Sequence, residues 1–450
     1  MQWSIHRNAT VIVIVSLFAL TSRAAADELP PPPSARPLGR DLPAALKGGL
    51  ESGSEPTGSL SLQDVLVLAV ARNPELAVFS WHERAADAQI IGAGLRPNPE
   101  LSLEVEDVGG TGESQGFKAA QFTLGLGQMI ELGGKRGARL AAARRLRDLA
   151  AWDYEAKRLE ILTRTAAAFI EVLAAQERIA LAEEAVRLAE QIETTVDARV
   201  NAARSHEAEG SRARIALASA RIERDLRQRK LLVARQHLAS HWGSTDPRYE
   251  RVDGDLSRVS ILPPYERLSV RLEQHPNLAR WATEATAREA FLRAETAGGR
   301  PDLTLGAGVR HRADVDENAA VLSVAMPLPL FNRNQGAIAA AKAALARTED
   351  ECGAARSSAH AALRSAYQSY EAARSEIALV EADVLPDAEE AFQAIRGGYE
   401  EGRFSFLEVL DVQHTLAAAR AQRLRALAEL HLSVVDIEAL IGESIEDAGR

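Results

Sequence analysis

The sequence predicts a mainly helical protein with a small β-strand portion, built from two copies of one structural unit. Three observations support this prediction. A pattern of residues recurs at an offset of about 200 residues, long stretches carry apolar residues at coiled-coil spacing, and four short segments alternate between apolar and polar residues. Length alone would suggest about three domains, but an internal repeat overrides that expectation.

The composition excludes several classes of protein. Apolar residues make up 46% of the 450 residues, which is too many for a disordered chain. The single cysteine, Cys352, cannot build a disulfide scaffold, a structural zinc site or an iron–sulfur cluster. The net charge of −10 lacks the basic excess of a nucleic-acid-binding protein.

The N-terminus has the pattern of a targeting segment. Residues 1–26 contain a polar start with Arg7, an apolar run and three alanines before Asp27, as a secretory signal peptide does; an uncleaved membrane anchor is the alternative. Residues 27–59 are rich in Pro, Gly and Ser and predict an extended arm, either a plain linker or a docking segment. No later stretch approaches about 18 consecutive apolar residues, so a mature chain that spans a membrane would have to use strands.

The repeat fixes the expected organisation of the rest of the chain. Three segments of the first half return in the second: 73–77 as 275–279, 133–138 as 332–337, and 242–243 as 441–442. These matches predict a first structural repeat over 60–243 and a second over 264–442, joined by a linker over 244–263 and followed by a C-terminal tail over 443–450.

Each repeat is expected to contain a helix, two strands joined by a loop, a very long helix and a second long helix, in that order. In the first repeat, a helix over 61–94 breaks at Asn73 and Pro74, because the residue before a proline is pushed away from helical geometry. A very long helix over 135–199 has its apolar residues at coiled-coil spacing and pairs with a helix over 207–242. The equivalents in the second repeat are helices over 338–396 and 405–441, with a kink at Pro386 in the first of these two.

The four predicted strands cover about 100–107, 118–129, 302–310 and 319–328. Each alternates apolar residues with small or polar residues, as a membrane β-barrel strand does, since lipid touches one face and water the other. Four strands cannot close a barrel, so this interpretation requires oligomerisation to remove the exposed strand edges. A soluble sheet of two hairpins lying on the helices is the alternative. Only Phe117 and Phe331 stand near the strand ends as candidates for an aromatic girdle.

Two segments resemble a known family. MIELGGKRGAR at 129–139 and PLPLFNRNQG at 327–336, together with the twofold repeat, resemble TolC-type outer-membrane efflux proteins, and the first segment resembles their heavy-metal resistance–nodulation–division (RND) branch. The resemblance covers about residues 60–442. It implies a homotrimeric α-barrel and β-barrel duct in which three chains contribute four strands each to a barrel in the outer membrane, above a coiled-coil helical tunnel in the periplasm.

The same resemblance implies the function and the partners. Such a duct passively conducts substrates, here heavy-metal cations, from a periplasmic adaptor (membrane fusion) protein and an inner-membrane RND pump to the exterior. It is not an enzyme and needs no cofactor.

The resemblance also assigns roles at the ends of the two helical hairpins. Gly402 marks a tight turn where a positive φ is expected. Glu408 and Asp411 lie three residues apart, share a helix face, and match acidic positions that ring a closed tunnel entrance. An ordinary solvated acidic face is the alternative.

The two hairpin tips differ in sequence. The positions expected to touch the adaptor are Gly402 and Arg403 in the second repeat and Ala203 and Arg204 in the first. Glu209 is the only acidic residue at the gate level of the first repeat, which puts an equal role for its tip in doubt.

Two other classes remain open on the sequence alone. A periplasmic coiled-coil adaptor is also exported, but it is expected to have one helical hairpin flanked by β-domains. An exported enzyme would need a convergent polar site. His206 and His414 are scattered, and the chain has no C-x-x-C or H-E-x-x-H motif, so we expect no catalytic residue and no bound metal cofactor.

Overall fold

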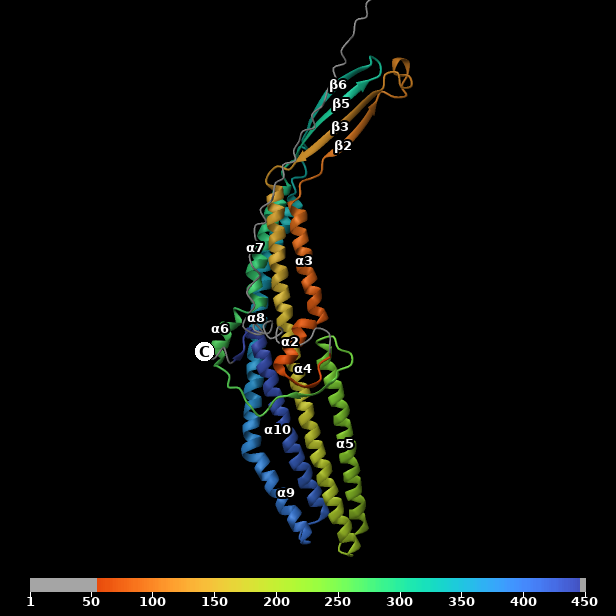
Figure 1. The fold of residues 1–450 in the computed structure, drawn as a ribbon. Coiled ribbons are helices and arrows are strands. Elements are labelled where there is room, and N and C mark those ends of the chain that lie inside the picture. The colour runs from red at the N-terminus through yellow and green to blue at the C-terminus, as the bar shows by residue number, and fades with distance from the viewer. Residues whose placement is uncertain (1–54, 446–450) are drawn as a thin grey trace, which may run out of the picture.

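The computed structural model describes residues 55–445. It is a long molecule with a β-sheet at one end, a helical body in the middle and two helical hairpin tips at the other end (Figure 1). The expected signal peptide over 1–26, most of the expected arm and residues 446–450 of the expected tail lie outside the described residues. The helices are α2 (Leu62–Arg72), α3 (Pro74–Gly94), α4 (Lys135–Asn201), α5 (Glu207–Ser240), α6 (Tyr265–Leu272), α7 (Pro276–Gly298), α8 (Gln335–Leu379), α9 (Leu385–Glu400) and α10 (Phe406–Ile441).

The main sheet contains one hairpin from each repeat. Its order is β2 (Glu100–Glu106), β3 (Gln121–Ile130), β5 (Leu303–Arg312) and β6 (Glu317–Ala325), with every neighbouring pair antiparallel. The sheet projects beyond the helices and none of them covers either of its faces (Figure 1). The alternative of a sheet lying on the helices is therefore wrong.

Two strands differ from their expected ranges by three residues at one end. β3 begins at Gln121 rather than at 118, because the chain ahead of it still belongs to the hairpin loop. β6 runs over Glu317–Ala325, although we expected it to reach 328. The early end has a physical reason, because Pro327 and Pro329 have no N–H with which to continue a strand ladder.

The two repeats use the same local devices to start their helices. Asn73 ends α2 and caps α3, since its Oδ1 accepts a hydrogen bond from the backbone N–H of Leu76 at 3.1 Å. Gly134 before α4 and Asn334 before α8 both adopt left-handed φ values, 75° and 61°. At about 1.5 Å per residue, the 67 residues of α4 extend about 100 Å along the molecule.

The helix over 338–396 is interrupted near the expected kink. A π-helical segment over Val380–Val384 separates α8 from α9, and Pro386 follows in the first turn of α9. A proline ring clashes with the carbonyl four residues earlier and offers no N–H to it, so the helix widens there instead of continuing regularly.

A second small sheet at mid-height was missed by the sequence analysis. β1 (Gly58–Ser61) pairs in parallel with β4 (Tyr249–Asp253), so the expected arm ends in a strand and the expected linker contains one. Gln176 of α4 forms two hydrogen bonds with the backbone of β4: its Nε2 donates to the Val252 carbonyl at 3.0 Å and its Oε1 accepts from the Val252 N–H at 2.9 Å. The largest apolar core of the described residues surrounds this sheet.

Within residues 55–445, no helix is long and apolar enough to cross a lipid bilayer.

Candidate functional site

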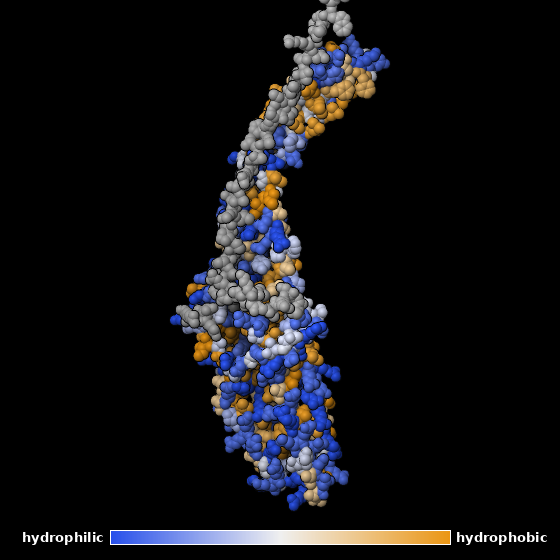
Figure 2. Space-filling model, in the orientation of Figure 1, coloured by the Kyte–Doolittle hydropathy of each residue, from blue (hydrophilic) through white to orange (hydrophobic). Residues whose placement is uncertain are grey.

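The two faces of the main sheet have opposite chemistry. Residues that pair directly across neighbouring strands point to the same face, so the register defines rows. One face carries two apolar rows: Leu101, Leu126, Ala307 and Leu322, then Leu103, Leu124, Val309 and Ala320. Most of these larger side chains are exposed, up to 84% for Leu322, and Figure 2 shows apolar residues gathered over the sheet. An exposed apolar sheet face of this kind fits lipid.

The other face of the sheet is polar and open. Near the strand loops, Arg310 donates to Thr123 Oγ1 at 2.9 Å and to Gln121 Oε1 at 3.2 Å, and its guanidinium lies 3.1 Å from Glu106. Toward the helices this face carries glycines at four positions: Gly125, Gly127, Gly306 and Gly308. A Cβ on Gly308 would lie 2.6 Å from the Leu124 carbonyl oxygen, so strands β3 and β5 need glycine to pack here.

At the opposite end of the molecule, both hairpin tips turn in the same way. Gly402 has a φ of 82°, which confirms the expected positive φ, and Ala203 has a φ of 54° at the equivalent position. In each tip the next residue reaches back to the preceding helix: the Arg204 N–H donates to the Arg199 carbonyl at 2.8 Å and the Arg403 N–H to the Gly398 carbonyl at 2.7 Å. Both are six-residue helix-ending turns with a left-handed residue before the last position.

The two tips give a matched pair of predictions. A left-handed conformation costs an L-residue about 1–2 kcal/mol, whereas glycine adopts it freely. Gly402→Ala is therefore expected to lower the free energy of unfolding by about 1 kcal/mol, and Ala203→Gly to raise it or leave it unchanged. Denaturant titration of the detergent-solubilised protein measures both. Equal destabilisation by the two substitutions would show that backbone strain does not control these turns.

A cluster at the tips holds the two hairpins of one chain together. Arg199, at the end of α4, donates from Nη1 to the Tyr399 carbonyl at 2.7 Å and to the Glu400 carbonyl at 3.3 Å. Its guanidinium also lies 4.7 Å from the centre of the Tyr399 ring. A cation at the carbonyl end of α9 interacts favourably with the helix dipole as well. We call Arg199, Tyr399 and Glu209 the tip lock.

Tyr399 and Glu209 complete the tip lock. The Tyr399 side chain is 4% exposed and packs against Phe406, Ile192 and Val196. Its hydroxyl donates to Glu209 Oε2 at 3.3 Å, and burial raises the pKa of this phenol above its usual value. The structure thus places Glu209 at the contact between the two hairpins rather than on a free surface.

Glu408 has a structural partner that the sequence analysis did not assign. Its carboxylate accepts hydrogen bonds from the Ser405 N–H at 2.7 Å and the Ser405 hydroxyl at 2.8 Å, and Ser405 Oγ accepts from the Glu408 N–H at 3.4 Å. This reciprocal pair is a capping box that starts α10. The hydrogen bonds from Ser405 hold the pKa of Glu408 below its usual value, so its charge persists to lower pH.

Asp411 is exposed on the next turn of α10, and no side chain of the described residues pairs with its carboxylate. Of the predicted site residues, the tip therefore brings Gly402 and Arg403 together with Glu408, while Asp411 lies one turn away and Glu209 lies at the lock. Arg199 and Tyr399 were missed by the sequence analysis. A helix-surface arginine and a tyrosine 200 residues apart carry no local signal, although the offset of the repeat does bring their positions to one level.

Among residues 55–445, no three His, Cys, Asp or Glu side chains lie close enough together to hold a metal ion. The molecule thus combines a sheet with one exposed apolar face, a long helical body and two hairpin tips that contact each other. Such an arrangement defines a class: a duct that is anchored in a membrane by strands and extends from it by helices.

Comparison with known proteins identifies the family. Residues 65–244 and 268–443 match the family described as Outer membrane efflux protein, and the chain belongs to it. The two matched segments follow the two repeats. The protein is therefore a channel component of the outer membrane with its helical portion in the periplasm, and its family is one of passive channels rather than enzymes. This family decides against the periplasmic adaptor.

Two relatives are similar over most of the chain. The cobalt-zinc-cadmium resistance protein CzcC of Cupriavidus metallidurans is 34% identical over 388 residues, which cover 86% of this chain and 91% of that protein. The nickel-cobalt-cadmium resistance protein NccC of Alcaligenes xylosoxydans xylosoxydans is 28% identical over 333 residues and 74% of each chain.

Solved structures agree on the fold. CusC has a TM-score of 0.74 at 19% identity, covering 87% of this chain and 96% of that chain. The outer membrane protein VceC of Vibrio cholerae has a TM-score of 0.70 at 18% identity, covering 85% and 96%. The mainly helical fold with a small β-strand portion and an internal repeat, predicted from the sequence, is thereby confirmed.

Proposed function

We propose that three copies of this chain form one duct, which passively conducts heavy-metal cations from a periplasmic adaptor and an inner-membrane RND pump to the exterior. The observation that carries the proposal is the sheet. It has an apolar face, a polar face and two edge strands, β2 and β6, whose outer edges are unpaired in the described chain. Unpaired edges are not tolerated in lipid, and closing four strands per chain into one barrel removes them.

The helical body supports the same assembly. α5 lies at one edge of the row of lower helices and α8 and α9 at the other (Figure 1). On α5, four exposed apolar side chains follow one another at spacings of 7, 4 and 7 residues: Ile215, Ile222, Leu226 and Val233. That spacing forms a coiled-coil seam, and no helix of the described chain covers it.

The charges at the two edges are complementary. α5 carries eight Lys and Arg against four Asp and Glu. The segment over 380–400 carries six Asp and Glu against one Arg. In a closed ring of three copies, α5 of one chain meets α8 and α9 of the next, so the seam is covered and opposite charges face each other.

The substrate assignment is supported by the relatives, whose names refer to cobalt, zinc, cadmium and nickel resistance. A strain in which the gene is deleted is expected to become sensitive to one or more of these divalent metals. If the deletion strain resists all of these metals normally but becomes sensitive to other exported compounds, the metal assignment is refuted. The proposed role as a duct would then still stand.

The tips provide the proposed contact with the adaptor. The turns at Ala203 and Arg204 and at Gly402 and Arg403 are the end of the molecule farthest from the sheet (Figure 1). Arg403 is exposed, and within the described residues its guanidinium forms an ion pair only with Glu401, two residues earlier, at 2.5 Å. Surface-exposed turns of this kind can meet a partner end to end without disturbing the helical body.

The proposed gate consists of Asp411 and Glu408, with Glu209 contributing through the tip lock. Threefold symmetry gathers six carboxylates from Glu408 and Asp411, and such a ring favours cations over anions. Asp411→Asn is expected to lower the cation preference of the channel more than Glu408→Gln does, because two hydrogen bonds from Ser405 hold the Glu408 carboxylate at the start of α10, whereas no side chain of the described residues pairs with the Asp411 carboxylate. Reversal potentials in planar bilayers measure the preference.

Glutamine is the suitable change at residue 408, since it retains the capping box. Glu408→Ala serves as the matched control for helix capping: it is expected to loosen the start of α10, which proteolysis at the tip detects. Unchanged ion selectivity in the double variant Glu408→Gln, Asp411→Asn would exclude this gate.

A further inference from the structure

A cavity of about 300 Å³ lies where α4, α5 and α10 meet, above the tips. An adjoining cavity of about 300 Å³ shares three of its residues, Arg178, Arg227 and Arg425, and adds Lys230 and Ala175. These four cationic side chains come from three helices. We call Arg178, Arg227, Lys230 and Arg425 the basic pocket.

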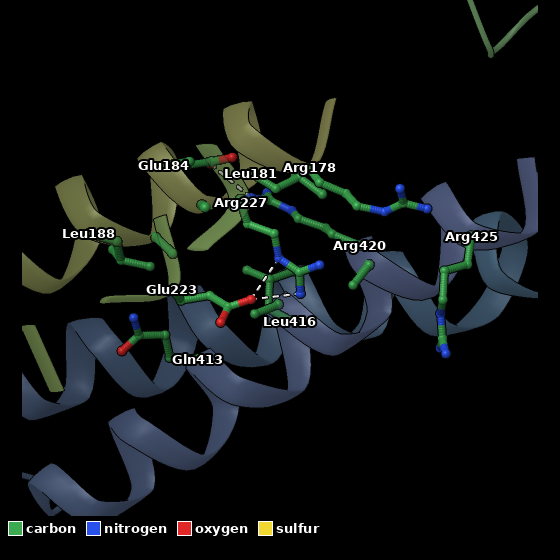
Figure 3. Close-up of a pocket in the computed structure, with 14 residues that line it drawn as sticks. Arg178, Leu181, Glu184, Leu188, Glu223, Arg227, Gln413, Leu416, Arg420 and Arg425 are labelled. Atoms are coloured by element: carbon green, nitrogen blue, oxygen red, sulfur yellow. Dashed lines mark hydrogen bonds and ion pairs between the residues drawn. The ribbon is translucent and has the colours of Figure 1, made fainter. Parts of the chain in front are cut away.

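The nearby acidic residues are already engaged. Glu223 pairs with Arg227 at 2.6 Å, and Glu184 pairs with Arg420 at 2.8 Å. Figure 3 shows the Glu223 contact and shows no contact to the guanidinium groups of Arg178 and Arg425. Among the described residues, no carboxylate pairs with Arg178, Lys230 or Arg425.

The uncompensated charges are held close together. Arg178 is half-buried against the apolar side chains Leu181 and Ala182. Burial lowers the pKa of Arg178, and the positive charges of Arg227 and Arg425 lower it further, while Glu171 offsets only part of this. Lys230 and Arg425 are exposed. Like charges gathered around a half-buried arginine cost free energy, and an anion placed between them relieves that cost.

Arg425 of the basic pocket lies on the same face of α10 as Asp411 of the proposed gate. Asp411, Ala418 and Arg425 follow at intervals of seven residues, so they share one face of the helix. At about 1.5 Å per residue, Arg425 stands about 21 Å farther along the molecule than Asp411. If Asp411 faces the tunnel, as the proposed function requires, the basic pocket faces it too.

We propose that the basic pocket binds a multivalent oxyanion, of the class of inorganic phosphate or a small polycarboxylate, inside the tunnel above the acidic gate. The guanidinium groups of Arg178 and Arg425 and the ammonium group of Lys230, which pair with no carboxylate of the described residues, suit an ion with several acceptor oxygens and two or more charges. Arginine binds such groups through paired hydrogen bonds. The tunnel position rests on the proposed function, whereas binding itself rests only on the pocket.

Such a site makes cation conduction depend on the anion. With the pocket empty, its positive field opposes the passage of divalent cations that have entered through the acidic gate. A bound oxyanion neutralises this field. Phosphate is therefore expected to increase cation conductance beyond what chloride gives at the same ionic strength.

The test uses the full mature protein in detergent and in planar bilayers, with inorganic phosphate as the probe. Phosphate binding to the wild type is measured by calorimetry in a chloride buffer of constant ionic strength, and conductance is measured in parallel. Removing one charge-assisted contact costs about tenfold or more in affinity, so Arg178→Gln and Arg425→Gln are each expected to weaken phosphate binding at least tenfold. Arg187→Gln, an exposed arginine on α4 outside the basic pocket, is the matched control and is expected to leave binding unchanged.

The outcomes separate this proposal from the proposed function. Absence of phosphate binding to the wild type, or binding that Arg178→Gln leaves intact, overturns the site. The site is also overturned if Arg178→Gln dissociates the oligomer while phosphate has no effect on binding or conductance. The basic pocket would then hold an acidic side chain of a second copy. Phosphate binding together with ion selectivity insensitive to Asp411→Asn supports the pocket and refutes the gate.

Discussion

Leu322→Arg is expected to prevent assembly of the protein in the outer membrane. Leu322 is 84% exposed and lies in an apolar row of the sheet with Leu101, Leu126 and Ala307. A charged side chain on the lipid face of a barrel costs about 2–4 kcal/mol near the middle of the bilayer, and the cost recurs in every chain of an oligomer. The amount of folded oligomer in isolated outer membranes, resolved by electrophoresis without heating, measures the effect.

The neighbouring residue provides the matched control. Ser323 pairs with Gly306 and points to the polar face of the same strand. Ser323→Arg adds the same charge at the same depth but places it in water, so normal assembly is expected. If both substitutions block assembly equally, the apolar face of this sheet does not contact lipid.

Arg199→Ala is expected to shift the tips toward an open state. The substitution removes the hydrogen bonds to the Tyr399 and Glu400 carbonyls and the contact with the Tyr399 ring. Hydrogen bonds from a charged donor contribute about 1.5–3 kcal/mol, so a loss of about 2 kcal/mol would change the ratio of open to closed tips about 30-fold. Single-channel recordings measure this ratio as open probability.

Arg396→Ala is the control for the tip lock. Arg396 lies one turn earlier on α9, and its contacts are longer: 3.7 Å to Glu400 and 3.5 Å to Gln191. Exposed ion pairs of this kind contribute little. An open probability that rises in Arg396→Ala as much as in Arg199→Ala would show that loss of any tip arginine matters, and the tip lock would have no special role.

Much of the fold could be predicted because its signals are local or repeated. The break between α2 and α3 follows from Asn73 and Pro74, whose side-chain and ring chemistry act on adjacent residues. The alternation along β5 and the coiled-coil spacing in α4 report directly on which face meets another element. Because these signals recur at an offset of about 200 residues, each copy supports the prediction made from the other.

The parts that could not be predicted depend on contacts between distant segments. β1 and β4 are four and five residues long, too short for periodicity, and they pair across about 190 residues of sequence. The tip lock joins Arg199 to Tyr399 through a turn geometry that only the folded hairpins create. The carboxylate of Glu408 was predicted as a gate residue, but its hydrogen bonds with Ser405 also give it a capping role that competes with that function.

The capping role of Glu408 has a consequence for acid stability. Because its folded-state pKa lies below the usual value, its contribution to stability is present above that usual value and is lost as the pH falls through the lowered pKa. The start of α10 is therefore expected to loosen only below the pH at which an ordinary surface glutamate is neutralised.

The central claim is that three chains close one barrel. Light scattering combined with size-exclusion chromatography of the membrane-extracted protein measures the mass of the protein apart from its bound detergent. The account predicts a species of three mature chains that requires detergent to stay in solution. A monomer that leaves the membrane fraction in salt alone and stays soluble without detergent would contradict it, because the apolar face and free edges of the sheet would then tolerate water.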